Sequence, residues 1–207
     1  MNYYIDFDHT LYNTPKLTKD MLNTISNFIA KEFNLDVTSI LSECKIMFNR
    51  NKIYNIYDLV KYFAKKYNFE ANTLILELNS VIYNSKHNVF EDSISFLEKL
   101  KKQKHNIYLL SYCEFGLEFQ TAKILGSGLI KYFDSIIITS KPKWELDLDF
   151  TQGIFIDDKP EDLINLFNKT PKDIIRIRRP GDTYSKENIE QIDMKEYTSL
   201  YDIPILN

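Results

Sequence analysis

The chain has 207 residues, of which 44% are hydrophobic and 27% charged, and its formal net charge is −3. This size suits one core domain with a substantial insertion, and the near-neutral charge argues against nucleic-acid polymers and anionic membranes as partners. No signal peptide or long apolar stretch is evident, and the two cysteines fit no disulfide framework. We therefore expect a cytoplasmic protein, and the sequence leaves its oligomeric state open.

The first predicted strand is a run of large apolar residues that ends at Asp6, in the sequence Tyr-Tyr-Ile-Asp-Phe-Asp-His-Thr. Residues two apart on a strand face the same way, so Asp6 and Asp8 should point together while Phe7 packs into the core. Two adjacent carboxylates repel each other unless a cation lies between them or one of them holds a proton. The pair indicates a metal and acid–base chemistry, and the alternative is a solvated strand end or a helix cap.

The segment that follows is predicted to be helical throughout. Apolar residues recur there at helical spacing, and no convincing strand interrupts them. The four runs cover residues 17–33, 35–47, 56–63 and 74–82.

Beyond this segment, helical and strand patterns alternate, which predicts a parallel α/β sheet. The expected helices lie at residues 92–104, 117–125 and after Pro160. The expected strands lie at residues 107–111, 135–139, 153–156 and 174–177.

Polar residues follow several of these strands. Ser111 ends the second strand, Lys141 follows the third, and Asp157 and Asp158 follow the fourth. Ligands of parallel sheets bind beyond the carboxyl ends of the strands, so we expect both acid pairs to share one crevice. Four carboxylates form the hard-oxygen set that Mg²⁺ prefers. Taken singly, the serine reads as a turn residue, the lysine as solvated and one aspartate as a helix cap before Pro160.

In chain order, an acid pair, a hydroxyl, a lysine and a second acid pair resemble the four signatures of the haloacid dehalogenase-like (HAD) hydrolase superfamily, made up mostly of phosphatases. The resemblance covers residues 3–14 and about 90–178. The helical segment falls where many members carry an inserted cap. The implied fold is an α/β, Rossmann-like parallel-sheet core at residues 1–15 and 88–207, with an all-helical cap domain at residues 16–87.

The resemblance also implies roles for individual residues. Asp6 resembles the nucleophile, Asp8 the general acid/base and Lys141 the catalytic lysine, while Thr10 and Ser111 would bind the substrate phosphate. The implied Mg²⁺ ligands are Asp6, Asp8, Asp157 and Asp158, with Asp158 the first choice for direct ligation. The lysine of the family usually lies further ahead of the final acids, so Lys143 is an alternative to Lys141.

The implied function is a Mg²⁺-dependent phosphatase that hydrolyses a small phosphorylated metabolite through an aspartyl-phosphate on Asp6. Four acids carry more charge than one Mg²⁺ and one lysine balance, so we expect Asp8 to be protonated. Members that dehalogenate typically lack this second acid. The stretch Asp157-Asp158-Lys159-Pro160 is similar to that of soluble deoxynucleotidases, and sugar phosphates are further candidate substrates.

Two other functions remain open. A phospho-accepting receiver also uses acids, a hydroxyl and a lysine, but the helical insertion after the first strand argues against it. A catalytically inactive binding module with the HAD fold is the other. Arg176, Arg178 and Arg179 are interpreted as charges on an exposed edge strand, and His9 is expected to point away from the two acids.

Overall fold

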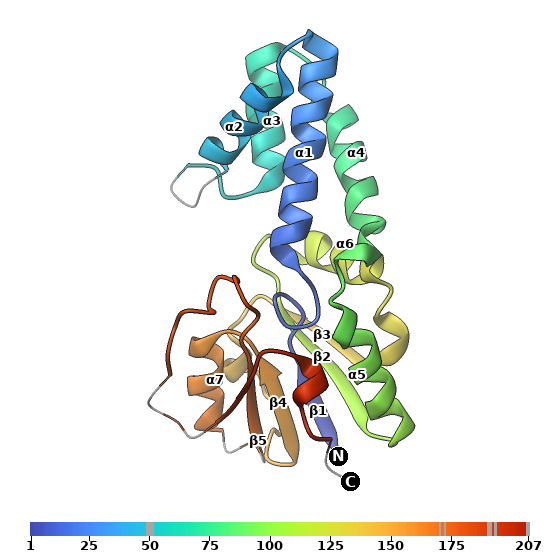
Figure 1. Ribbon diagram of the computed structural model, residues 1–207, viewed down its shortest axis with the longest axis vertical. Helices are drawn as coiled ribbons and strands as arrows, with labels where there is room; N and C mark the ends of the chain where they lie inside the picture. The colour runs from blue at the N-terminus through green and yellow to red at the C-terminus, as the bar shows by residue number, and fades with distance from the viewer. Residues whose placement is uncertain (49–51, 170, 172, 190–191, 193, 206–207) are drawn as a thin grey trace. The chain divides into compact units, whose positions relative to one another are not determined.

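The computed structural model divides the chain into two compact units, Met1–Thr14 with Lys86–Asn207 and Pro15–Ser85 (Figure 1). The residues that it describes are 1–48, 52–169, 171, 173–189, 192 and 194–205.

The first unit is built on a six-stranded parallel sheet in the order β3-β2-β1-β4-β5-β6. The strands are β1 (Asn2–Ile5), β2 (Asn106–Tyr112), β3 (Ser135–Thr139), β4 (Gly153–Asp157), β5 (Asp173–Ile177) and β6 (Lys195–Tyr197). The first five confirm the predicted strands. The sixth was not predicted, because Lys-Glu-Tyr has neither the length nor the apolar pattern of a strand.

Helices cover both faces of this sheet (Figure 1). Helices α5 (Glu91–Lys102) and α6 (Leu117–Ser127) pack against β2 and β3, and α7 (Pro160–Phe167) packs against β4 and β5 from the other side. The chain runs from β1 towards β3 in one direction and from β4 towards β6 in the other. The neighbouring strands β1 and β4 therefore flank the point where the direction reverses, which is where open α/β sheets bind ligands.

The described residues of this unit also form three short 3-10 helices, η2 (Ile130–Tyr132), η3 (Lys143–Glu145) and η4 (Leu200–Asp202). A further one, η1 (Ser85–Asn88), begins at the last residue of the second unit.

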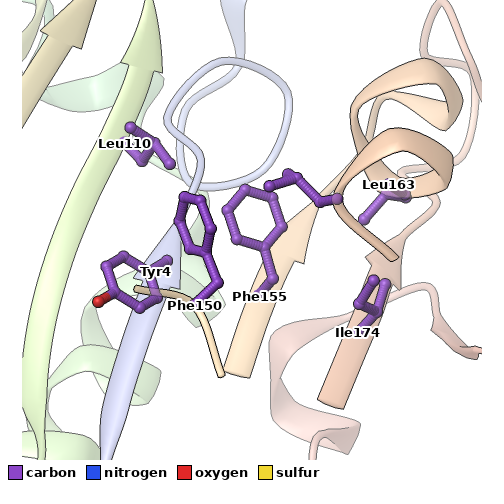
Figure 2. Packing of buried hydrophobic residues seen from close by; sticks show 7 residues of the cluster. Tyr4, Leu110, Phe150, Phe155, Leu163 and Ile174 are labelled. Atoms are coloured by element: carbon purple, nitrogen blue, oxygen red, sulfur yellow. The ribbon is translucent and has the colours of Figure 1, made fainter. Parts of the chain in front are cut away.

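A buried hydrophobic cluster fills the space between the sheet and α7 (Figure 2). Tyr4 of β1 lies edge-on to Phe150, with 5.1 Å between ring centroids, and Phe155 packs beside them. Gly153 makes room for the tyrosine ring, since a Cβ atom at this glycine would lie 2.5 Å from Cε2 of Tyr4. The other members are Leu110, Leu163, Leu166 and Ile174.

The described part of the second unit, residues 15–48 and 52–85, forms four helices, as the apolar spacing predicts. These are α1 (Thr14–Phe33), α2 (Val37–Met47), α3 (Ile56–Tyr67) and α4 (Ala71–Tyr83). The carboxylate of Asp36 caps α2 by accepting from the backbone N–H of Ser39 at 2.7 Å, and Asn55 caps α3 in the same way through Tyr57. Among the described residues, no helix combines the length and the apolar character needed to cross a membrane.

Candidate functional site

Two aspartates lie side by side at the carboxyl end of the sheet. Ile5 of β1 pairs with Ile156 of β4, so the next residues, Asp6 and Asp157, lie beside each other. The backbone N–H of Asp6 donates to the carbonyl of Ile156 at 2.9 Å, which fixes this register. Both carboxylates are buried. The reversal point of the sheet thus carries two acids on neighbouring strands.

Asp158 joins them to form an acid cluster, defined as Asp6, Asp157 and Asp158, with one oxygen of each carboxylate within 4.8 Å of the others. The buried Oδ2 of Asp158 has no hydrogen-bond partner among the described residues. Burial and the neighbouring acids Asp157 and Asp6 raise the pKa of Asp158 well above its usual value. Burial also raises the pKa of Asp6, to about 7. Hard oxygens, one of them unpartnered, fit a divalent cation such as Mg²⁺.

Lys143 is the cation that the structure places against this cluster. Its Nζ lies 2.6 Å from Oδ1 of Asp6 and 2.6 Å from Oδ2 of Asp157, and 3.6 Å from Oδ2 of Asp162. Desolvation opposes the charge on the lysine, but Asp157, Asp6 and Asp162 hold its pKa well above the usual value. The buried ammonium therefore remains charged and balances part of the acid cluster.

This placement corrects the choice of Lys141, whose side chain is exposed and outside the cluster. The backbone N–H of Lys141 donates to Oγ1 of Thr139 at 2.9 Å, closing a turn straight after β3. Pro142 follows, and η3 then carries Lys143 to its buried position. The sequence shows two lysines two residues apart, and only the path of this turn distinguishes them.

Asp162 is a neighbouring acid that the sequence analysis missed. It lies in the first turn of α7, which begins at Pro160, and its side chain is buried. Burial and the charge of Asp157 raise the pKa of Asp162 to about 6. The available signal was its position one helical turn beyond Asp158, at the start of a helix that faces the strand end.

Asp8 does not join the acid cluster through its carboxylate. Oδ1 accepts from Nζ of Lys123 at 2.5 Å and from the hydroxyl of Thr14, and Oδ2 accepts from Nε2 of Gln120 at 2.7 Å. Burial alone would raise the pKa of Asp8, but Lys123 and these hydrogen bonds lower it. Two expectations are therefore corrected: the side chain of Asp8 is not in the metal-binding group, and it is held ionised rather than protonated.

The reason lies in the local backbone. The strand ends at Ile5, so the rule that alternate residues share a face no longer applies at Asp8. The chain turns here, with His9 in the left-handed region at φ 62°, and the imidazole Nδ1 of His9 pairs with Oδ1 of Asp182. The hydrogen bond to Asp182 raises the pKa of His9 against the effect of burial.

The two predicted phosphate ligands have different environments. Ser111 lies at the end of β2, buried, and its Oγ accepts from Nε2 of Gln120 at 2.7 Å, which connects it to Asp8. The Oγ1 of Thr10 is buried without a hydrogen-bond partner among the described residues. The backbone carbonyl of Thr10 accepts from Nη2 of Arg179 at 2.8 Å.

Gln120 and Lys123 were missed although both touch the predicted site. They lie three residues apart on α6, and both side chains are buried. Residues at this spacing share a helix face. The available signal was a glutamine and a lysine among the apolar residues of this helix. Nothing in the sequence alone shows which strand end this face meets.

The arginines near β5 are not charges on an exposed edge. β6 extends the sheet beyond β5, Arg176 is fully buried and Arg178 is partly exposed. The guanidinium of Arg179 is buried in a bidentate ion pair with Asp92, at 2.6 and 2.8 Å. Because it also holds the carbonyl of Thr10, this ion pair braces the loop that carries Asp6 and Asp8.

Comparison with solved structures places this arrangement in a known fold. A haloacid dehalogenase-like hydrolase from Burkholderia xenovorans aligns with a TM-score of 0.68 at 17% identity, covering 97% of this chain and 93% of that one. A HAD phosphatase from Thermococcus onnurineus gives 0.62 at 18% identity, covering 97% and 95%. A dehalogenase solved as an intermediate complex gives 0.54 at 17%, covering 97% and 93%. Neither a family model nor a curated protein sequence matches the chain.

Proposed function

Because the chain has the fold of the HAD hydrolases, we propose that it is a hydrolase and, more narrowly, a Mg²⁺-dependent phosphatase of small phosphomonoesters. The observation that carries the proposal is the buried contact of Asp6 with Lys143 inside the acid cluster. A carboxylate with a fixed counter-charge, at the reversal point of a parallel sheet, is suited to attack phosphorus. The presence of Asp8 supports phosphate esters over halogenated acids as substrates.

The metal would be held by Asp6, Asp157 and Asp158, whose oxygens already converge. When bound, Mg²⁺ would offset the negative charge of the transferring phosphoryl group. Lys143 would offset more of the negative charge of the carboxylates and the phosphoryl group, because its ammonium already contacts Asp6 and Asp157.

In the first half of the proposed reaction, a carboxylate oxygen of Asp6 forms a bond to phosphorus. The bond from phosphorus to the ester oxygen breaks, and that oxygen leaves with the electron pair and takes up a proton from solvent water. Ser111 would hold a phosphate oxygen during this step. The product is an aspartyl-phosphate on Asp6 and a free alcohol.

In the second half, water attacks the same phosphorus and the bond to Asp6 breaks. Lys123 holds Asp8 ionised, so this carboxylate can accept the proton that the water loses. The proton that Asp8 accepts then returns to solvent, because the contact with Lys123 favours the ionised carboxylate. Asp6 is regenerated and phosphate is released, so the net reaction consumes one ester and one water.

The helical unit Pro15–Ser85 is our proposed cap, since it is inserted directly after the loop that carries Asp6 and Asp8. We propose nucleotides and sugar phosphates as the first substrates to test. The cytoplasm remains the proposed location, supported by Cys44 and Cys113, which are both free thiols.

The test is a turnover screen with an aryl phosphate, nucleoside monophosphates, sugar phosphates and 2-haloacids, in Mg²⁺ and in EDTA. The variants are Asp6→Asn and, as the matched control, Asp147→Asn at an exposed position of the loop before β4. We expect Mg²⁺-dependent phosphate release that falls roughly 1000-fold or more in Asp6→Asn only. Release of halide instead of phosphate, or full activity in Asp6→Asn, would refute the proposal.

A further inference from the structure

Gln120 of helix α6 contacts both Asp8, the proposed acid/base, and Ser111, the proposed phosphate ligand. The side-chain nitrogen Nε2 of Gln120 lies 2.7 Å from Oδ2 of Asp8 and 2.7 Å from Oγ of Ser111. Gln120 is 2% exposed and Ser111 is fully buried, so water does not compete for these contacts. One amide therefore bridges the proposed acid/base and the proposed phosphate ligand.

The orientation of this amide follows from its partners. The carboxylate of Asp8 also accepts hydrogen bonds from the ammonium of Lys123 and the hydroxyl of Thr14, so it is the acceptor in each of these contacts. An acceptor requires the NH₂ group of Gln120, because the carbonyl end of the amide would repel it. The same nitrogen then faces Ser111, and the serine oxygen must accept.

The accepting role determines what the serine can offer to a ligand. A hydroxyl has one hydrogen to donate and lone pairs with which to accept. Since the amide of Gln120 occupies a lone pair of Ser111, the hydroxyl hydrogen is left for another acceptor. A serine that donated to a carbonyl instead would present only lone pairs, which repel an anionic oxygen.

The position of Gln120 is fixed by packing around the next turn of its helix. The ammonium of Lys123 lies 5.4 Å from the ring centroid of Phe119 and 5.9 Å from that of Phe7, besides its contact with Asp8. These contacts connect α6 to the loop after β1. The amide of Gln120 is therefore held between the loop after β1, which carries Asp8, and the end of β2, which carries Ser111.

We propose that Gln120 is a positioning residue that makes the Ser111 hydroxyl a hydrogen-bond donor to a phosphate oxygen of the substrate. The same amide fixes the distance between the Ser111 hydroxyl and the carboxylate of Asp8. The inference rests on the proposed phosphatase function, because it names the ligand oxygen as part of a phosphate. Gln120 itself is not required to touch the substrate.

The experiment measures the binding of inorganic phosphate in Mg²⁺ by titration calorimetry, together with kcat and KM for an aryl phosphate. Gln120→Met keeps the length of the side chain and removes the donor, and Gln120→Glu replaces the donor by an acceptor. Gln103→Met is the matched control, because it makes the same change at an exposed position before β2, at the other end of the strand. Thermal unfolding reports whether each variant is folded.

We expect Gln120→Met to raise the phosphate Kd and the KM about 10-fold and Gln120→Glu about 100-fold, with Gln103→Met unchanged. The diagnostic result is a double-mutant cycle with Ser111→Ala. If Gln120 acts through the serine hydroxyl, Gln120→Met should weaken phosphate binding by less than about 2-fold once that hydroxyl is gone. A purely structural role would give the same loss in both backgrounds.

The outcomes separate this inference from the proposed function. Turnover of phosphate esters with unchanged phosphate affinity in folded Gln120→Met or Gln120→Glu overturns the inference and leaves the function standing. Wild-type protein that binds phosphate but hydrolyses no ester overturns the function, and the cycle still decides the inference. Wild-type protein that binds no phosphate overturns the inference whatever it hydrolyses.

Discussion

The ammonium of Lys143 lies 2.6 Å from Oδ1 of Asp6, and both side chains are almost completely removed from solvent. The lysine reaches Asp6 from a 3-10 helix that follows β3, whereas Asp6 follows β1. A buried pair of this kind leaves an uncompensated charge when either partner is removed. Lys143 is therefore expected to matter both for the reaction and for the folded state.

The first prediction compares two lysines that lie two residues apart. Lys143→Met should lower kcat roughly 100-fold or more, because it removes a fixed charge beside the proposed nucleophile. It should also lower the free energy of unfolding by roughly 3 kcal/mol at neutral pH. Lys141→Met, at the exposed neighbour, is the control and should leave both quantities nearly unchanged. Steady-state kinetics and urea unfolding measure the two effects, and equal losses in both variants would contradict the assignment.

The second prediction concerns pH and the metal. The pKa of Asp6 is raised to about 7 and that of Asp162 to about 6, so the folded state binds these protons more tightly than the unfolded state. Their contribution to stability is therefore present below pH 4 and is lost as the pH rises through 6 and 7. A divalent cation should restore it by favouring the charged carboxylates.

The measurement is the Tm in EDTA and in Mg²⁺ at pH 5 and pH 7.5. The increase caused by Mg²⁺ should be larger at pH 7.5, and smaller in Asp158→Asn than in wild type. Asp8 and Asp92 have lowered pKa values, so their contribution to the stability of the protein is lost at acid pH instead. This loss should be the same in EDTA and in Mg²⁺. An Mg²⁺ effect that is equal at both pH values would argue against a metal at the acid cluster.

The third prediction tests the buried ion pair behind the loop of Asp6 and Asp8. Arg179→Met leaves Asp92 buried without its cation and should lower the free energy of unfolding by about 3–5 kcal/mol. Arg178→Met is the matched control, and its partly exposed pair with Glu196 should cost less than about 1 kcal/mol. Chemical denaturation gives both values. Similar losses of unfolding free energy in Arg179→Met and Arg178→Met would show that the buried pair with Asp92 stabilises the fold no more than the partly exposed pair does.

The fourth prediction tests the packing of Tyr4 against Gly153. Gly153→Ala puts a methyl group into the space of the tyrosine ring and should cost about 1–3 kcal/mol of stability. The ring is held in a buried cluster and cannot move away freely. In a Tyr4→Leu background the same alanine should cost less, because the ring is absent. A cost that does not change with residue 4 would place the strain elsewhere.

Much of the fold could be predicted from sequence, because apolar periodicity is a direct consequence of which faces are buried. It identified the first five strands and the helices between them. It missed β6, whose residues Lys195–Tyr197 carry no such pattern. Strand ends also located Asp6, Asp157, Asp158 and Ser111 at one edge of the sheet, since parallel strands bring their carboxyl ends together.

The remaining site residues depend on geometry that no local pattern encodes. The choice between Lys141 and Lys143 rests on one turn after β3. The direction of Asp8 depends on the turn at His9, where strand alternation has already ended. Lys123 faces this loop only because α6 packs as it does, and its charge is what keeps Asp8 ionised.

The partners of the two acids come from different parts of the chain, and this has a consequence for biosynthesis. The groups that hold Asp8, from Thr14, Gln120 and Lys123, all precede residue 128. The groups around Asp6, from Lys143, Asp157 and Asp158, follow it. A chain emerging from the ribosome can complete the surroundings of Asp8 first. The acid cluster gains Asp157 and Asp158 only when translation has passed the end of β4, so a shorter nascent chain lacks the complete proposed centre.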